Sequence, residues 1–234
     1  MLKAVIFDFD GVITDSEILH LRSFNRVLAQ QYGVEITTKA YYKDYLGLTD
    51  FECFKLVADE KQLALDNQQI ANLMKQKTQI FEELAKTEGQ IIEGVPDFLK
   101  MLRQNNILLA ICSGAVQVEI ELILEQARLR PYFDAIVSAE HVKKGKPHPE
   151  GFLLTLQRLN KIVSPAQAGI QNPILPNQCI VIEDSHWGLK AAKAAGMHTV
   201  ATTNSYDADQ LSLAEKIVAR LNELSIDDLQ QLCA

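Results

Sequence analysis

Short apolar runs rich in β-branched residues recur along the chain. They cover residues 4–7, 107–112, 135–137, 180–182 and 199–201, with a further candidate at 217–218. A short, continuous apolar run without alternation is typical of a strand that is buried on both faces. We therefore predict a strand at each of these positions.

Stretches with helical periodicity lie between these runs. They cover residues 95–104, 116–128, 151–160 and 188–195. Strands that alternate with helices predict a parallel sheet covered by helices on both faces, which is an α/β fold of the Rossmann-like, three-layer kind. One connection is long for such a fold: residues 162–178 carry prolines and asparagines, and the sequence gives this loop no role.

Residues 16–88 interrupt the alternation, because this segment has helical patterns and no convincing strand. The predicted helices cover residues 18–31, 38–45, 50–60 and 68–86. The segment starts directly after the first predicted strand. We therefore expect an α/β core domain made of residues 1–15 and 89–234, with an all-helical domain of residues 16–88 inserted on two short linkers.

Composition narrows the class of protein. The chain has 234 residues, 47% of them apolar, which is enough for a large core without disulfides. Its net charge of -7 disfavours binding to nucleic acid or to anionic lipid. No apolar run approaches the ~18 residues of a membrane span. Asp8 and Asp10 interrupt the first apolar run, which argues against a signal peptide. We expect a cytoplasmic protein, a monomer or weak homodimer.

Four cysteines are scattered along the chain without a CxxC pair. A disulfide framework and a zinc site are therefore both disfavoured. Cys112 and Cys179 lie within apolar runs, so we interpret them as small core residues.

Polar side chains follow the predicted strands at the points where the strands end. They lie in residues 8–11, 113–114, 143–147 and 183–185. Open α/β sheets bind ligands at the carboxyl ends of their strands. The sequence therefore predicts one site that gathers carboxylates, a hydroxyl and a lysine at a single sheet edge.

Asp8 and Asp10 are two residues apart, so on a regular strand they share a face and their charges repel. A divalent cation relieves that repulsion, and Mg²⁺ prefers oxygen ligands and substrate phosphate. Asp184 and Glu183 supply further carboxylates from another strand end. The alternative is a set of solvated strand ends or helix N-caps, which fits one aspartate better than the whole set.

Four signatures occur in order along the chain. They are residues 5–12 (VIFDFDGV) followed by Asp15 and Ser16, then Ser113 and Gly114, then residues 145–147 (GKP), and residues 182–185 (IEDS) before a helix rich in alanine. Together they resemble the haloacid dehalogenase superfamily of phosphotransferases, in the branch related to β-phosphoglucomutase. The resemblance covers essentially the whole chain and implies an enzyme whose helical insert is a cap.

The resemblance implies that Asp8 is a nucleophile that forms an aspartyl-phosphate. It implies that Asp10 is the general acid and base and that its backbone carbonyl is a metal ligand. It places Gly11 beside them in substrate binding. Haloacid dehalogenases themselves lack the second aspartate and use no metal, so Asp10 favours phosphate chemistry.

The same resemblance implies that Ser113 and Lys146 hold the phosphoryl oxygens, with Gly114 beside them. It implies that Asp184 is a direct Mg²⁺ ligand and that Glu183 lies in or next to the ligand shell. The expected cofactor is Mg²⁺, and the expected partner is a small phosphorylated metabolite.

The inserted helices resemble a lid that excludes water or selects the substrate. Glu17 and His20 follow the first linker, and Lys77 resembles a cap lysine that reaches substrate in relatives. Two alternatives stay open from the residues themselves: His20 as a half-buried helix residue and Lys77 as a solvated helix lysine.

The cap loop departs from the β-phosphoglucomutase pattern. These mutases carry an arginine after Gly-x-Ser that holds the second phosphate of the substrate, whereas this loop has Gly47 and then Asp50 at the arginine position. A carboxylate repels phosphate, unless Arg22 or Lys43 compensates. Gly47 and Asp50 are therefore candidate substrate-binding residues.

The sequence thus favours a Mg²⁺-dependent phosphatase that acts on a small phosphate monoester, a sugar phosphate or a similar metabolite. The alternatives are a sugar-phosphate mutase, a phosphonate hydrolase using Lys43 or Lys55 in a Schiff base, and a non-catalytic protein that binds a phosphorylated ligand.

Overall fold

The computed structural model describes residues 1–163 and 173–234 and contains one parallel sheet. Its strands are β1 (Ala4–Phe7), β2 (Leu108–Cys112), β3 (Ala135–Val137), β4 (Cys179–Glu183), β5 (His198–Thr202) and β6 (Lys216–Val218). Within the described ranges the sheet has six strands in the order β3-β2-β1-β4-β5-β6. The predicted parallel α/β sheet is confirmed. Most of the predicted loop 162–178 lies outside the described residues.

The central strand β1 is buried on both faces, as its apolar run predicts. Val5 and Phe7 pack into the core on one side of the sheet, whereas Ala4 and Ile6 pack into the core on the other. All four residues are 0% exposed, so water contacts neither face of this strand. A strand whose two faces are both covered has no room for polar alternation.

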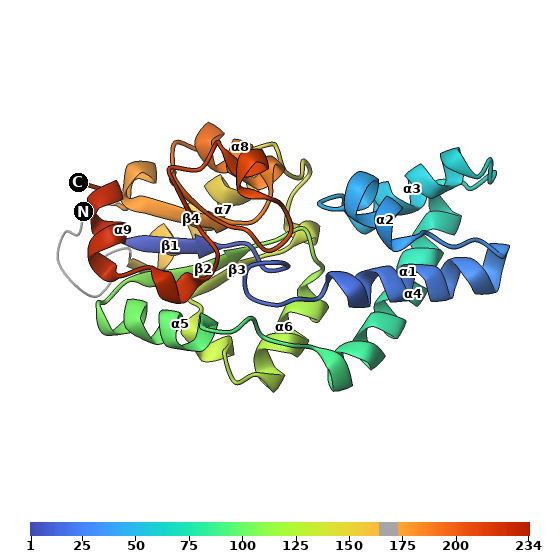
Figure 1. Ribbon diagram of the computed structural model, residues 1–234, viewed down its shortest axis with the longest axis horizontal. Coiled ribbons are helices and arrows are strands. Elements are labelled where there is room, and N and C mark those ends of the chain that lie inside the picture. The colour runs from blue at the N-terminus through green and yellow to red at the C-terminus, as the bar shows by residue number, and fades with distance from the viewer. Residues whose placement is uncertain (164–172) are drawn as a thin grey trace.

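Helices cover the two faces of the sheet (Figure 1). On one face lie α5 (Val95–Gln104), α6 (Gln117–Gln126) and α9 (Ile226–Leu232), and on the other lie α7 (Glu150–Val163) and α8 (His186–Ala194). Helix α6 is shorter than predicted, because Arg128 takes a left-handed φ of 57°. Helix α9 was not predicted, although Ser225 and Asp228 form a capping box at its start that is readable as Ser-x-x-Asp.

The inserted segment is helical, with its own apolar core around Phe24, Phe54 and Leu73. It contains α1 (Glu17–Tyr32), α2 (Thr38–Ala40), a wide helical turn at Tyr41–Tyr45, α3 (Asp50–Glu60) and α4 (Asn67–Glu88). The helix predicted over 38–45 is present, but only its first turn is α-helical and the rest is the wider turn. The expected domain limits at residues 16 and 88 stay a prediction. Among the described helices, none has the length and apolarity that a bilayer crossing requires.

Strand pairing determines which residues meet at the carboxyl edge of the sheet. Phe7 is in register with Ile111 of β2 and with Ile182 of β4. The next residue, Asp8, donates its N–H to the carbonyl of Ile182 at 2.9 Å. The segments after β1, β2 and β4 therefore leave the sheet side by side, and in Figure 1 this edge faces the inserted helices.

Burial predicts which leucines support the fold. Leu99 of α5 is 0% exposed and packs under β1, so Leu99→Ala leaves a cavity and should lower the free energy of unfolding by about 2–5 kcal/mol. The control is Leu153→Ala in α7, where the side chain is 45% exposed and the expected change is within about 0.5 kcal/mol. Urea unfolding followed by circular dichroism measures both. Equal losses would contradict the placement of Leu99 in the core.

Candidate active site

A cavity of about 330 Å³ lies where the carboxyl edge of the sheet meets the inserted helices. Most of the predicted site residues line it: Asp8, Asp10, Ser113, Gly114, Lys146, Asp184, Glu17, His20, Gly47 and Asp50. Gly11, Glu183 and Lys77 lie behind this lining. The structure therefore brings residues from both parts of the chain to one place.

Asp8 lies at the centre of the sheet edge, and its side chain is 13% exposed. One carboxylate oxygen accepts the backbone N–H of Phe9 at 2.7 Å. The other is 2.8 Å from Nζ of Lys146. Burial and the nearby charge of Glu183 raise the pKa of Asp8 well above its ordinary value, although Lys146 opposes this rise.

Asp8, Glu183 and Asp184 form an acidic cluster in which one oxygen from each lies within 4.8 Å of the others. Burial, followed by the charges of Glu183 and Asp8, raises the pKa of Asp184 well above its ordinary value. Three carboxylates this close favour a bound cation over three solvated acids. Their oxygen donors fit the preference of Mg²⁺ for hard ligands.

Glu183 is the member of this cluster that the residues at the start of α8 hold in place. Its Oε2 accepts the backbone N–H groups of Asp184 and Ser185 at 3.1 and 3.0 Å, as well as the Ser185 hydroxyl at 2.8 Å. Its Oε1 lies 2.5 Å from Nζ of Lys146. Because Glu183 is 0% exposed and already occupied, it is better placed to orient Lys146 and Asp184 than to face a substrate.

Lys146 supplies a positive charge that offsets the carboxylates of Asp8 and Glu183. It lies between Asp8 and Glu183, and although burial acts against its charge, these two carboxylates raise its pKa above the ordinary value. Across the cavity lining, Ser113 accepts the N–H of Ala115 at 2.9 Å, which leaves its own hydroxyl proton available to a ligand.

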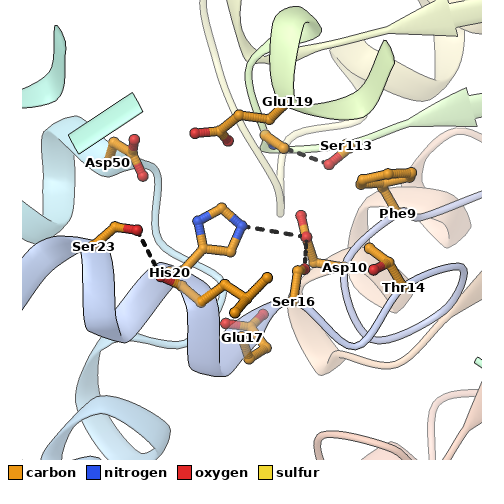
Figure 2. Close-up of polar contacts among 12 residues, drawn as sticks. Phe9, Asp10, Thr14, Ser16, Glu17, His20, Ser23, Asp50, Ser113 and Glu119 are labelled. Carbon is orange, nitrogen blue, oxygen red and sulfur yellow. Dashed lines mark hydrogen bonds and ion pairs between the residues drawn. The ribbon is translucent and has the colours of Figure 1, made fainter. Parts of the chain in front are cut away.

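Asp10 is not a member of this acidic cluster, and its carboxylate points toward Ser16 and His20 (Figure 2). Its carboxylate accepts a hydrogen bond from the Ser16 hydroxyl and lies 3.3 Å from Nε2 of His20. Burial acts to raise the pKa of Asp10, but these partners hold it below its ordinary value. Asp8 and Asp10 both line the cavity, and the charge of Asp10 contributes to the raised pKa of Asp8, but the strand that would fix a shared face ends at Phe7. The metal-binding role of the Asp10 carbonyl stays a prediction.

His20 lines the cavity as a candidate site residue should, but it is more buried than the half-buried alternative, whereas Lys77 differs from both of its interpretations. His20 is 7% exposed, and its ring stacks on Phe81 with the centroids 4.3 Å apart. Lys77 is 0% exposed, so it is not a solvated helix lysine. It also does not line the cavity, which argues against direct contact with substrate. Its ammonium nitrogen instead lies 2.8 Å from Nδ1 of His20 and 3.1 Å from Glu119.

Sequence reasoning missed Glu119. The apolar periodicity of residues 116–125 predicts ordinary core packing and no site residue. Glu119 is nevertheless 1% exposed and faces Lys77. One signal was available: Glu119 is an acid at a position on the buried face of α6, as its apolar periodicity indicates. A buried carboxylate needs a partner, so such a residue is a candidate for an ion pair.

The cap loop is in contact with the α/β core. Gly47 has a φ of 83°, and a Cβ added there would come 3.2 Å from the Trp187 ring. Trp187, at the start of α8, also lines the cavity. Asp50 also lines the cavity, but its carboxylate lies 3.0 Å from Nζ of Lys77.

The proposed compensation of Asp50 by Arg22 or Lys43 is wrong. Arg22 pairs with Glu88 at 2.5 Å, Lys43 pairs with Asp44 at 3.3 Å, and neither Arg22 nor Lys43 lines the cavity, whose lysines are Lys143, Lys144 and Lys146. Glu17 does line it and accepts the Tyr41 hydroxyl at 2.8 Å. Burial raises the pKa of Glu17 to about 7.

Known proteins are similar to this chain in sequence and in architecture. Residues 5–202 match the family described as haloacid dehalogenase-like hydrolase. Phosphorylated carbohydrates phosphatase of Thermotoga maritima is 32% identical over 201 residues, which are 85% of this chain and 84% of that protein. Fructose-1-phosphate phosphatase YqaB of Escherichia coli is 32% identical over 198 residues, 84% of this chain and 94% of that protein.

Two solved structures illustrate the similarity in three dimensions. The crystal structure of β-phosphoglucomutase from Clostridium difficile has a TM-score of 0.84 at 26% identity, and the match covers 100% of this chain and 97% of that one. CbbY from Rhodobacter sphaeroides, crystallised with phosphate, has a TM-score of 0.86 at 23% identity, covering 98% and 100%. The latter identity supports the shared fold alone.

The packing around Gly11 predicts its effect on metal binding. A Cβ at Gly11 would lie 1.8 Å from Oδ2 of Asp184, so Gly11→Ala should displace that carboxylate and weaken Mg²⁺ binding by about tenfold or more. The control is Gly33→Ala. Gly33 has a similar left-handed φ of 66° but nothing within 4 Å of the added Cβ. Titration calorimetry with Mg²⁺ measures both affinities. Equal affinities in the two variants would contradict the role of Asp184 as a ligand.

Proposed function

The chain belongs to the haloacid dehalogenase-like hydrolase family and is a phosphoric monoester hydrolase, and on that basis we propose a mechanism and a substrate class for it. It hydrolyses a small phosphate monoester, a sugar phosphate or a similar metabolite, through an aspartyl-phosphate on Asp8. The observation that carries the proposal is Asp8 itself, a carboxylate held at the sheet edge by Lys146 and the N–H of Phe9.

In the first step an oxygen of Asp8 attacks phosphorus, and the bond from phosphorus to the leaving oxygen breaks. Asp10 gives its proton to that oxygen, which leaves as an alcohol. In the second step Asp10 takes a proton from water as the water attacks the aspartyl-phosphate, which releases phosphate and restores Asp8. The carboxylate form favoured by Ser16 and His20 suits the second step, and the negative charge of a bound phosphate favours the protonated form that the first step requires.

The remaining groups position the phosphoryl group and offset its charge. Lys146 and the Ser113 hydroxyl line the cavity on the side of Asp8, where they can donate to phosphoryl oxygens. Mg²⁺ held by Asp8, Asp184 and the Asp10 carbonyl would neutralise charge on the same oxygens. Glu183 keeps Lys146 in place from below.

Water is the better acceptor of the phosphoryl group than a second sugar hydroxyl. A mutase must hold a substrate that carries a second phosphate, for which a forked guanidinium is suited. At the corresponding place the cavity has Asp50, and its partner Lys77 is turned inward. The Schiff-base alternative has no support from the cavity, since Lys43 and Lys55 do not line it.

The cellular setting completes the proposal. All four cysteines are free and buried, which fits a reducing compartment, so we place the enzyme in the cytoplasm. We propose that it acts as a monomer or weak homodimer. Its partner is the phosphorylated metabolite, without nucleic acid or membrane.

A phosphate-release screen tests the mechanism. Sugar phosphates, nucleotides and glycolytic intermediates are each supplied with Mg²⁺. We expect Asp8→Asn to lower turnover of the best substrate more than about 10³-fold, because the nucleophile is lost. EDTA should abolish turnover and excess Mg²⁺ should restore it. The control Asp59→Asn changes an exposed acid of α3 and should leave the rate unchanged. Full activity of Asp8→Asn would refute the covalent mechanism.

A second assay separates hydrolysis from mutase activity. Incubation with β-glucose 1-phosphate and a bisphosphate primer should give either free phosphate or no reaction, because the cavity offers Asp50 where a mutase needs a cation. Phosphate and glucose 6-phosphate are measured in the same sample. Robust glucose 6-phosphate formation without free phosphate would instead identify a mutase.

A further inference from the structure

We propose that Glu119 is a positioning residue for the general acid and base Asp10, acting through Lys77 and His20. The inference rests on the proposed function, in which Asp10 moves protons. Glu119 belongs to α6 of the α/β core, whereas Lys77 and His20 belong to the inserted helices α4 and α1. The series of contacts therefore crosses from the core to the insert and returns to the core at Asp10.

Lys77 uses all of its hydrogen-bonding capacity inside the protein. An ammonium group has three donors. The three acceptors around it are Nδ1 of His20 at 2.8 Å, Glu119 at 3.1 Å and Asp50 at 3.0 Å. No donor remains for a substrate, so the effect of Lys77 on the site has to pass through one of these partners.

Glu119 and Asp50 keep the buried Lys77 charged. A lysine that is 0% exposed would lose its proton without nearby anions. Although burial opposes its charge, the carboxylates of Asp50 and Glu119 raise the pKa of Lys77 above the ordinary value. Figure 2 shows both carboxylates pointing toward the side of His20 that faces away from Asp10. Burial raises the pKa of Glu119, and the Lys77 ammonium opposes that rise.

The charged Lys77 determines which ring nitrogen of His20 carries the proton. Because an ammonium only donates, Nδ1 of His20 must accept from it, and the proton of the neutral ring must lie on Nε2. Nε2 is the nitrogen that lies 3.3 Å from the Asp10 carboxylate, so it donates there. Stacking on Phe81 fixes the plane of the ring.

Glu119 has a role that Asp50 does not have. Asp50, Lys77 and His20 all belong to the inserted helices, whereas Glu119 belongs to the core helix α6, which follows Ser113. The contact between Lys77 and Glu119 is therefore complete only when the insert is docked on α6. Docking and the orientation of His20 toward Asp10 thus depend on the same ion pair.

Glu119→Gln tests the proposal, since it keeps the shape and removes the charge. We expect kcat for the best phosphate ester to fall about 10-fold to 100-fold with KM within about twofold, because misplaced acid–base groups slow the chemical step. Glu119→Asp, which keeps the charge, should recover much of the rate. The control Glu121→Gln removes a carboxylate from the same helix that pairs with Arg130 at 2.6 Å, and should match the wild type.

A spectroscopic readout makes the test independent of turnover. The ¹⁵N shifts of the His20 ring, assigned by their loss in His20→Asn, should place the proton on Nε2 in the wild type. In Glu119→Gln they should move toward a mixture of the two tautomers. A proton on Nδ1 in the wild type, or unchanged shifts and kcat in Glu119→Gln, would overturn the proposal. If no phosphate ester is hydrolysed, the proposed function fails, while the shifts still decide the tautomer.

A third variant separates positioning from stability. Lys77→Met combined with Glu119→Leu replaces the fully buried ion pair by apolar side chains of similar size, an exchange that is often neutral for stability. It leaves Asp50 at the cavity lining, where its side chain is 17% exposed. We expect a folded protein, checked by thermal unfolding, whose kcat is still lowered about 10-fold or more because His20 has lost the ammonium at Nδ1. Wild-type kcat in this folded variant would mean that Glu119 serves stability alone and would overturn the proposal.

Discussion

The repulsion between carboxylates at one edge of a parallel sheet is the constraint on which the rest of this structure depends. The register of β1 with β4 places Asp8 next to Glu183 and Asp184, and each of them is largely shielded from water. Close, buried carboxylates cannot all stay ionised without cations. Lys146 supplies one positive charge from within the chain, and the geometry of the three oxygens suits a metal ion that would supply more.

Buried charges are balanced a second time where the core meets the inserted helices. Asp10 is not part of the first cluster, and its direct partners are Ser16 and His20. Lys77 lies behind them and is matched by Asp50 and Glu119. Each buried lysine thus lies between two carboxylates. Asp8, proposed to form the bond to phosphorus, and Asp10, proposed to move the proton, therefore lie in different charge environments. Each carboxylate can for this reason have its own pKa.

Much of this could be predicted from the sequence, because the signals were local. Buried strands give continuous apolar runs, and polar residues at the ends of parallel strands must meet. The sequence therefore predicts that Asp8, Ser113, Lys146 and Asp184 lie together, and all four line the cavity. The contacts of Asp10 with Ser16 and His20 could not be predicted, because alternation stops being a guide where the strand ends. Lys77 and Glu119 are 42 residues apart in the chain, and no periodicity indicates that two helices from different parts of the fold will bury them against each other.

Asp50 shows why a single position in the cap is not read by itself. Taken as a replacement for an arginine, it only removes a phosphate-binding charge. In the structure it is one of the two anions around Lys77. The negative charge at position 50 therefore balances the charge of Lys77, whatever ligand the cavity binds. A cation at position 50 would face the buried ammonium of Lys77 and would compete with its contact to His20. The lack of a cation at position 50 and the hydrogen bonding of Asp10 therefore both depend on the same buried ion pairs. We expect substrate specificity and the handling of the proton to change together for that reason.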